Sequence, residues 1–147
     1  NLGVLYANGV GVSQDYEAAV KWFRLAAEHG HANTYYNLGV LYEDDAESLT
    51  GKNPDEIKLR TSFHWYLQAA ERGVAQAQLN VGLMYTMGKG APKNNEYAHM
   101  WFNLAGSKGL KIAKHYRMQV EKQLPAPEIA RAKDLAKQWV RKHGNPN

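Results

Sequence analysis

The chain has 147 residues, 44 % of them apolar and 22 % charged, a composition typical of one folded domain rather than of a disordered segment. It contains no cysteine, which excludes disulfides, thiolate metal sites and thiol nucleophiles. The net charge of +4 is unevenly distributed, because residues 1–107 sum to −3 and residues 108–147 sum to +7.

One pattern of residues occurs three times along the chain. An apolar residue is followed by glycine, a tyrosine comes three residues after the glycine, and a tryptophan comes further on. The copies begin at Leu2, Leu38 and Val81 and lead to Trp22, Trp65 and Trp101. The last two tryptophans are 36 residues apart, whereas the first two are 43 apart. Repetition at this period predicts an all-α solenoid of stacked helix-turn-helix units, without strands.

The period divides the chain into a first unit at 1–30, a second at 31–73, a third at 74–109 and a C-terminal segment at 110–147. The first unit enters its second helix after the turn Gly9–Val12. The second unit carries seven extra residues between Tyr42 and Trp65. They produce an acidic, polar insertion, and its 48–53 stretch is a candidate protrusion toward a partner.

The third unit has the clearest boundaries. Apolar spacing predicts one helix over 75–87 and another over 95–107, with a Gly-Lys-Gly break and Pro92 between them. Gly82 lies in the middle of the first helix, as Gly39 does in the second unit, and mid-helix glycine costs up to about 1 kcal/mol against alanine. We expect close backbone approach there, against the small pairs Ala69-Ala70 and Ala105-Gly106, with the tryptophans filling the wider part of the interface.

The repeat pattern weakens after Gly109. Residues 110–123 still predict a helix, but Arg117 and Met118 occupy the positions of the expected Leu and Gly. An amphipathic helix over 128–143 follows, and the two helices suit a terminal capping unit with a polar outer face. The basic surplus is interpreted as that solvated face. Binding of nucleic acid or anionic lipid through it is the less favoured alternative.

No catalytic, cofactor or metal site is predicted. Gly9 and Gly11 lack the third glycine and the preceding strand of a dinucleotide loop. The six histidines form no His-Glu-x-x-His pattern, and the acidic insertion lacks the ligand spacing of a calcium loop. His64 and His99 are expected beside the buried stripe of their helices. The longest uncharged stretch, 73–88, is too polar to span a bilayer, and no signal peptide is recognised.

The repeated markers resemble the Sel-one-like repeat, a relative of the tetratricopeptide repeat. The first unit follows that pattern from Leu2 to Gly30, the third keeps it with Val81 for Leu, and the second loses its Gly-x-Gly turn to the insertion. The resemblance implies a right-handed α/α superhelix and a non-catalytic adaptor or scaffold. It also suggests a bacterial periplasmic or secreted protein, with a cytoplasmic location as the alternative. Because the chain starts inside the repeated pattern, we expect an upstream portion.

The predicted function is binding of a partner protein or peptide to the concave face formed by the first helix of each unit. The oligomeric state is not predicted. The expected contact residues are the helix positions left free by the packing argument, although Tyr36 and Leu79 could equally pack against the next unit. The alternatives are an enzyme or enzyme accessory acting on cell-wall or other small substrates, and a nucleic-acid binder that uses the basic end. The contact residues are Asn33, Tyr36, Asn37, Val40, Gln76, Leu79, Asn80 and Leu83.

Overall fold

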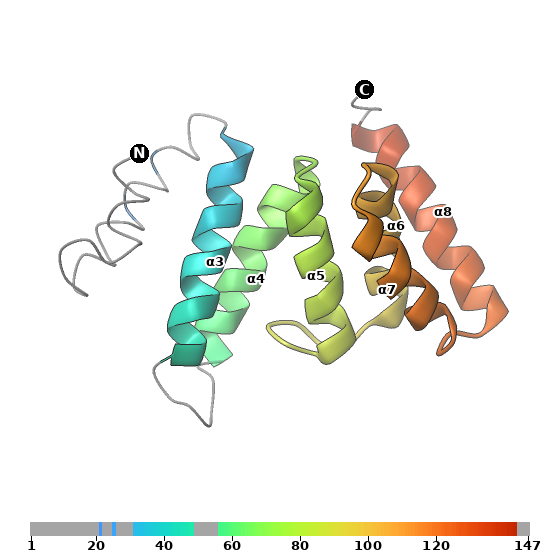
Figure 1. Cartoon of the computed structure of the whole chain (residues 1–147), viewed down its shortest axis with the longest axis horizontal. Helices are drawn as coiled ribbons and strands as arrows, with labels where there is room; N and C mark the ends of the chain where they lie inside the picture. The colour runs from blue at the N-terminus through green and yellow to red at the C-terminus, as the bar shows by residue number, and fades with distance from the viewer. Residues whose placement is uncertain (1–20, 22–24, 26–30, 49–55, 144–147) are drawn as a thin grey trace.

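The computed structural model describes residues 21, 25, 31–48 and 56–143, and every regular element of two or more turns within them is an α-helix. The helices follow one another along the long axis of the molecule (Figure 1). They are α3 (Ala32–Ser48), α4 (Glu56–Glu71), α5 (Ala75–Met87), α6 (Asn95–Ser107), α7 (Lys111–Glu121) and α8 (Ala126–His143). The predicted helices of the first unit, and most of the 48–53 insertion, lie outside the described residues.

The packing order is that of a solenoid. Helix α4 packs against both α3 and α5, whereas α6 packs against α5, α7 and α8. From α3 to α7 each described helix therefore packs on the next helix in the chain, whereas α8 packs on α6. The prediction of an all-α superhelix of stacked hairpins is confirmed.

The boundaries of α5 and α6 coincide with the predicted ranges, and local chemistry explains both ends. Gly88 ends α5 in the left-handed region at φ 67°, where its N–H bonds to the Met84 carbonyl. A residue with a side chain is strained in that conformation, so glycine suits the position. At the start of α6 the Asn94 side chain accepts a hydrogen bond from the Tyr97 N–H at 3.0 Å. This cap satisfies one of the free donors of the first helical turn.

The mid-helix glycines do mark places where helices approach closely, but their partners differ from the predicted ones. A Cβ built on Gly39 would lie 2.5 Å from Cδ1 of Tyr66, and one built on Gly82 would lie 2.5 Å from Cε1 of Phe102. The expected small pairs are largely buried nearby, yet they are not the nearest atoms. Each glycine makes room for an aromatic ring of the following helix, which corrects the glycine-to-alanine prediction.

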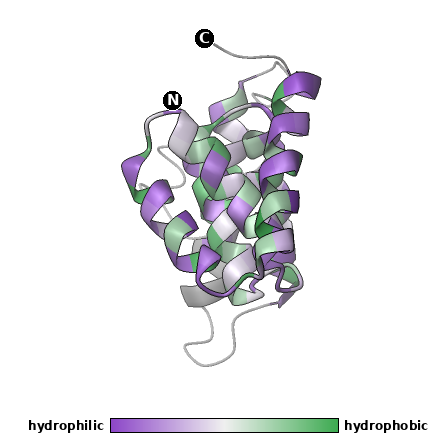
Figure 2. Ribbon diagram, turned by 90° about the vertical axis from the view of Figure 1, so that its right-hand side faces the viewer, coloured by the Kyte–Doolittle hydropathy of each residue, from purple (hydrophilic) through white to green (hydrophobic). Residues whose placement is uncertain are grey.

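Two apolar clusters hold the helices together. The first joins α4, α5, α6 and α8 through residues such as Tyr66, Val81, Trp101 and Ala136, and the second joins α5, α6 and α7 around Phe102. Hydrophilic and hydrophobic residues alternate along the helices, as expected for amphipathic elements (Figure 2). Among the described helices, none combines the length and apolarity needed to cross a membrane.

The two histidines expected beside the buried stripe of their helices differ in exposure. His64 is exposed on α4, next to Trp65 in an edge-on arrangement. His99 is fully buried in α6, and its Nε2 lies 2.8 Å from Oε1 of Glu121 on α7. The hydrogen bond from His99 lowers the pKa of the Glu121 carboxyl below its ordinary value of 4.5, assisted by the positive charges of Arg117 and Lys133. The pair therefore links α6 to α7 most strongly while Glu121 is ionised.

This shift predicts a pH dependence of stability. A carboxyl whose pKa is lower in the folded state contributes stability above its unfolded pKa, and that contribution is lost as pH falls through the folded value. We expect the free energy of unfolding to fall more steeply for the parent chain than for Glu121→Gln between about pH 5 and pH 3. Urea denaturation across that range measures both slopes. Parallel slopes would contradict the assignment of the shift to Glu121.

Candidate partner-binding surface

The predicted contact residues of α3 lie at different depths. Asn33 is exposed, whereas Tyr36, Asn37 and Val40 are half-buried. Tyr36 and Val40 pack against the first apolar cluster, and the Tyr36 ring tilts over Tyr66 with 5.6 Å between ring centroids. The helix thus offers two amides to solvent at positions 33 and 37, and beside them a partly covered apolar strip.

Helix α5 repeats this arrangement with one difference. Gln76 is exposed, Asn80 and Leu83 are half-buried, and the Gln76 Nε2 donates to the Asn80 Oδ1 at 3.4 Å. Leu79, the counterpart of Tyr36, is 6 % exposed and belongs to the second apolar cluster with Phe102. Its side chain is used in packing between helices, so we remove Leu79 from the candidate surface.

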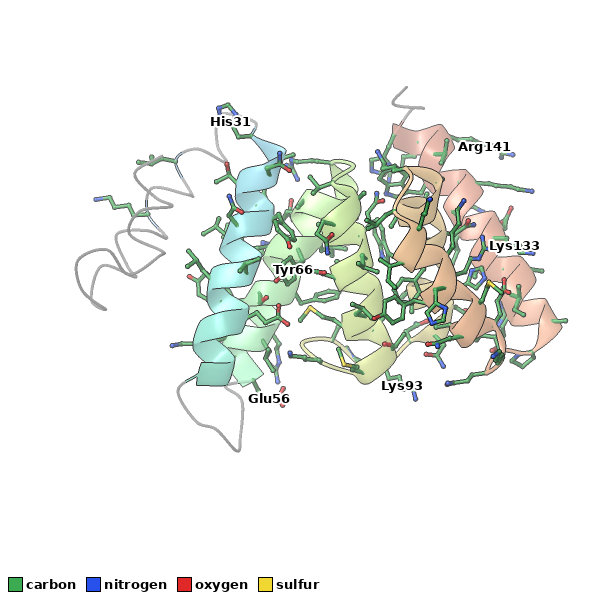
Figure 3. All side chains as sticks on the ribbon, viewed as in Figure 1. His31, Glu56, Tyr66, Lys93, Lys133 and Arg141 are labelled. Atoms are coloured by element: carbon green, nitrogen blue, oxygen red, sulfur yellow. The ribbon has the colours of Figure 1, made fainter. Side chains whose placement is uncertain are left out.

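A polar network connects α3, α4 and the turn that follows α5. The buried Tyr66 hydroxyl donates to Oε1 of Glu43 at 2.7 Å, and Lys89 Nζ donates to the other carboxylate oxygen at 3.1 Å. Burial of the ring, followed by the bond to Glu43, raises the pKa of Tyr66. The phenol therefore stays protonated. Tyr66 lies near the middle of the molecule in Figure 3. The network ties α3 to α4 and to the turn that follows α5.

The structure adds residues that the sequence reasoning missed. The repeat period of 36 residues relates Gln76, Asn80 and Leu83 to Ile112, Tyr116 and Gln119. In α7, Ile112 is 46 % exposed, Gln119 is exposed and Tyr116 is half-buried, stacked on Phe102 at 5.6 Å. Extending the period into the weakened fourth copy would have found them. We define the A-helix surface as Asn33, Tyr36, Asn37, Val40, Gln76, Asn80, Leu83, Ile112, Tyr116 and Gln119.

The chemistry of this surface is that of recognition. It presents carboxamide groups, which both donate and accept hydrogen bonds, next to aliphatic and aromatic side chains. Within the described residues, no three His, Asp or Glu side chains are grouped so that they could hold a metal ion.

Comparisons with known proteins place these features in a family. The model of the family described as Sel1 repeat matches residues 1–31, 32–74 and 75–110. A protective antigen of uropathogenic Escherichia coli with an SLR fold is 30 % identical, with a TM-score of 0.78, over 97 % of this chain and 29 % of its own length. A Sel1 repeat protein from Oxalobacter formigenes is 33 % identical, with a TM-score of 0.64, over 79 % of this chain and 45 % of its own.

No curated protein matches the chain. The chain spans less than half the length of the two solved structures, so it corresponds to a portion of each. The Sel1 repeat fold is generally a non-catalytic scaffold, and proteins with these repeats commonly bind other proteins. The three matched repeats cover residues 1–110, and on that ground the chain belongs to the Sel1 repeat family.

Proposed function

We propose that this chain is a non-catalytic adaptor module that binds a partner protein or peptide along the A-helix surface. The observation that carries the proposal is the recurrence of amide and aliphatic side chains at equivalent positions of α3 and α5. In α7 the same positions hold Ile112, Tyr116 and Gln119, so the mixed polar and apolar character continues there with the types exchanged. In a solenoid the core residues pack between neighbouring units. Side chains that recur outside this core remain available for a ligand.

The residues support a mixed polar and apolar contact. Asn33 and Gln76 are exposed amides, and amide groups can bond the backbone of a peptide laid across the helices. Leu83 and Ile112 add partly exposed aliphatic surface. Interface energy usually concentrates in a few side chains, so changing a small set should reveal the face that is used.

The test is affinity capture with the full-length protein and with a variant that carries Asn33→Ala, Gln76→Ala and Leu83→Ala together. We expect the variant to retain its partner at least about tenfold less strongly, as the loss of interface contacts implies. The matched control carries Arg60→Ala, His64→Ala and Tyr97→Ala, three exposed residues of the second helices α4 and α6.

The two variants separate the possible outcomes. Reduced capture by the first variant alone would support the A-helix surface. Reduced capture by the control alone would place the partner on the opposite helices. Equal capture by both variants and the parent would refute the choice of face. Far-ultraviolet circular dichroism of each variant verifies that the helices are intact.

A further inference from the structure

A groove of about 480 Å³ lies where the repeat pattern weakens, and it shares no residue with the A-helix surface. Its lining comes mainly from α6 and α8, and α7 contributes Arg117. Four cationic side chains line it: Arg117 from α7, and Lys133, Lys137 and Arg141 from α8. Figure 3 shows Lys133 and Arg141 along α8.

Two sequence changes account for the opening. In α3 and α5, a fully buried Leu38 or Val81 precedes the glycine that receives an aromatic ring. In α7 the equivalent pair is Arg117 and Met118. Met118 cannot make room for a ring as glycine does, and Arg117 replaces an apolar core residue. Accordingly, α7 and α8 each pack on α6, whereas the earlier hairpins pack their two helices on each other.

The positive charge of the groove is only partly compensated. No carboxylate lines it, and none of its four cations forms an ion pair within 4.0 Å among the described residues. Of the nearby acids, Glu121 pairs directly with His99 and interacts with Arg117 and Lys133 only at longer range, and Asp134 accepts a hydrogen bond from Gln138 at 2.6 Å. Four like charges around one hollow repel one another, so an anionic occupant would relieve that repulsion.

Arg117 is the least satisfied member of the set. Its Nε is buried without a hydrogen-bond partner, and its Nη1 donates to Asn103 Oδ1 at 3.5 Å, the outer limit for such a bond. A buried donor without a partner costs free energy, and a guanidinium bonded this weakly can turn toward an acceptor. A carboxylate matches its planar fork in shape and charge.

The lining also has an apolar part, which narrows the choice of occupant. Leu104, Ala136 and Val140 line the groove together with the four cations. Single-stranded nucleic acid is usually held by aromatic side chains that stack on its bases, and no aromatic side chain lines the groove. A duplex would offer phosphates to the cations but no apolar side chain to the apolar part of the lining. An acidic peptide can instead place an aliphatic side chain on the apolar lining and direct flanking carboxylates toward the cations.

We propose that the groove formed by α6, α8 and Arg117 of α7 binds an acidic segment of a partner protein, with an apolar side chain seated beside Leu104 and Val140 and carboxylates bonded to Arg117, Lys137 and Arg141. The site arises from the departure from the repeat pattern at positions 117 and 118. Because it is separate from the A-helix surface, either site can fail its test while the other passes.

The experiment measures fluorescence polarisation of a labelled peptide, Glu-Leu-Glu-Glu-Leu-Glu, titrated with the whole chain at about 0.15 M salt. Two comparison peptides replace every Glu by Gln or every Leu by Ala. We expect the original peptide to bind, and each replacement to weaken binding about tenfold or more. A duplex oligonucleotide and vesicles containing phosphatidylserine test the other anionic partners.

Two double variants locate the bound peptide. Lys137→Gln with Arg141→Gln removes two groove charges, whereas Lys111→Gln with Lys142→Gln removes two exposed charges outside the lining. We expect about tenfold weaker binding for the first double variant and unchanged binding for the second. Exposed glutamines leave the helices intact, which circular dichroism verifies.

Each remaining outcome overturns the proposal. Absence of peptide binding, or an equal loss in the two double variants, would show that no specific acidic-peptide groove exists. Binding that is indifferent to the leucines would remove the apolar subsite. Groove-dependent binding of the oligonucleotide or of the vesicles in preference to the peptide would assign the groove to nucleic acid or to a membrane surface.

Discussion

Replacing Trp101 by alanine should lower the free energy of unfolding by about 3–5 kcal/mol, the range typical of a buried aromatic residue truncated to a methyl group. Trp101 is 3 % exposed and lies in the first apolar cluster. Its ring meets Trp139 of α8 edge-on, with 6.0 Å between centroids. Urea denaturation followed by circular dichroism measures the change, with the slope compared between variants to verify the same transition.

The matched control for this prediction is Met118→Ala. Met118 is also a large apolar side chain in a helix, but it is 57 % exposed, so its removal should change stability by less than about 0.5 kcal/mol. Equal destabilisation by the two substitutions would contradict the interior role of Trp101. The cluster around Trp101 includes residues of α4, α5, α6 and α8. We therefore also expect Trp101→Ala to destabilise the helices of more than one hairpin.

The repeat period predicted the third unit closely because several local signals agree there. Gly88 and Asn94 end one helix and begin the next through their own backbone and side-chain chemistry. Those signals act within a few residues and can be read from a single sequence. The fold class followed for the same reason, since each repeated hairpin must bury its apolar stripe against the next one.

The sequence did not show which residues pack against the mid-helix glycines. Spacing shows that Gly82 needs a close neighbour, but not whether Phe102 or Ala105, one helical turn apart, lies over it. Leu79 illustrates the same limit, because a helix in a solenoid has neighbours on both sides and its apolar stripe is wide. Leu79 is buried because it packs against residues of α6 and α7. Those residues are distant in the sequence, so spacing within α5 alone does not show the contact.

The basic groove shows a different limit of sequence reasoning. Arg117 and Met118 are visible in the sequence as departures from the repeat, and by themselves they indicate only that the pattern fades. Their consequence depends on where α8 packs. Because α8 packs on α6 and not on α7, the departure becomes a hollow lined by four cations rather than a poorly packed hairpin.

The second large effect is expected at Gly82. Alanine there would place its Cβ 2.5 Å from Cε1 and 2.7 Å from Cδ1 of Phe102. The ring is fully buried and stacked on Tyr116, so it has little room to retreat. Overpacking of this kind costs about 1–3 kcal/mol, and we expect Gly82→Ala to show a net loss in that range. The improved helix propensity of alanine, worth up to about 1 kcal/mol, opposes the loss.

Gly106 provides the control, because it is also a buried helical glycine, in the last turn of α6, with a different neighbour. A Cβ there would lie 2.9 Å from Cγ of Lys114, an exposed side chain rather than a buried ring. Gly106→Ala should therefore cost less than Gly82→Ala, because Lys114 can change its rotamer toward solvent. Adding Phe102→Leu to Gly82→Ala should cost less than the sum of the two single changes, since the smaller side chain relieves the clash. Strict additivity, or equal stability of the two alanine variants, would mean that the ring over Gly82 does not set the distance between α5 and α6.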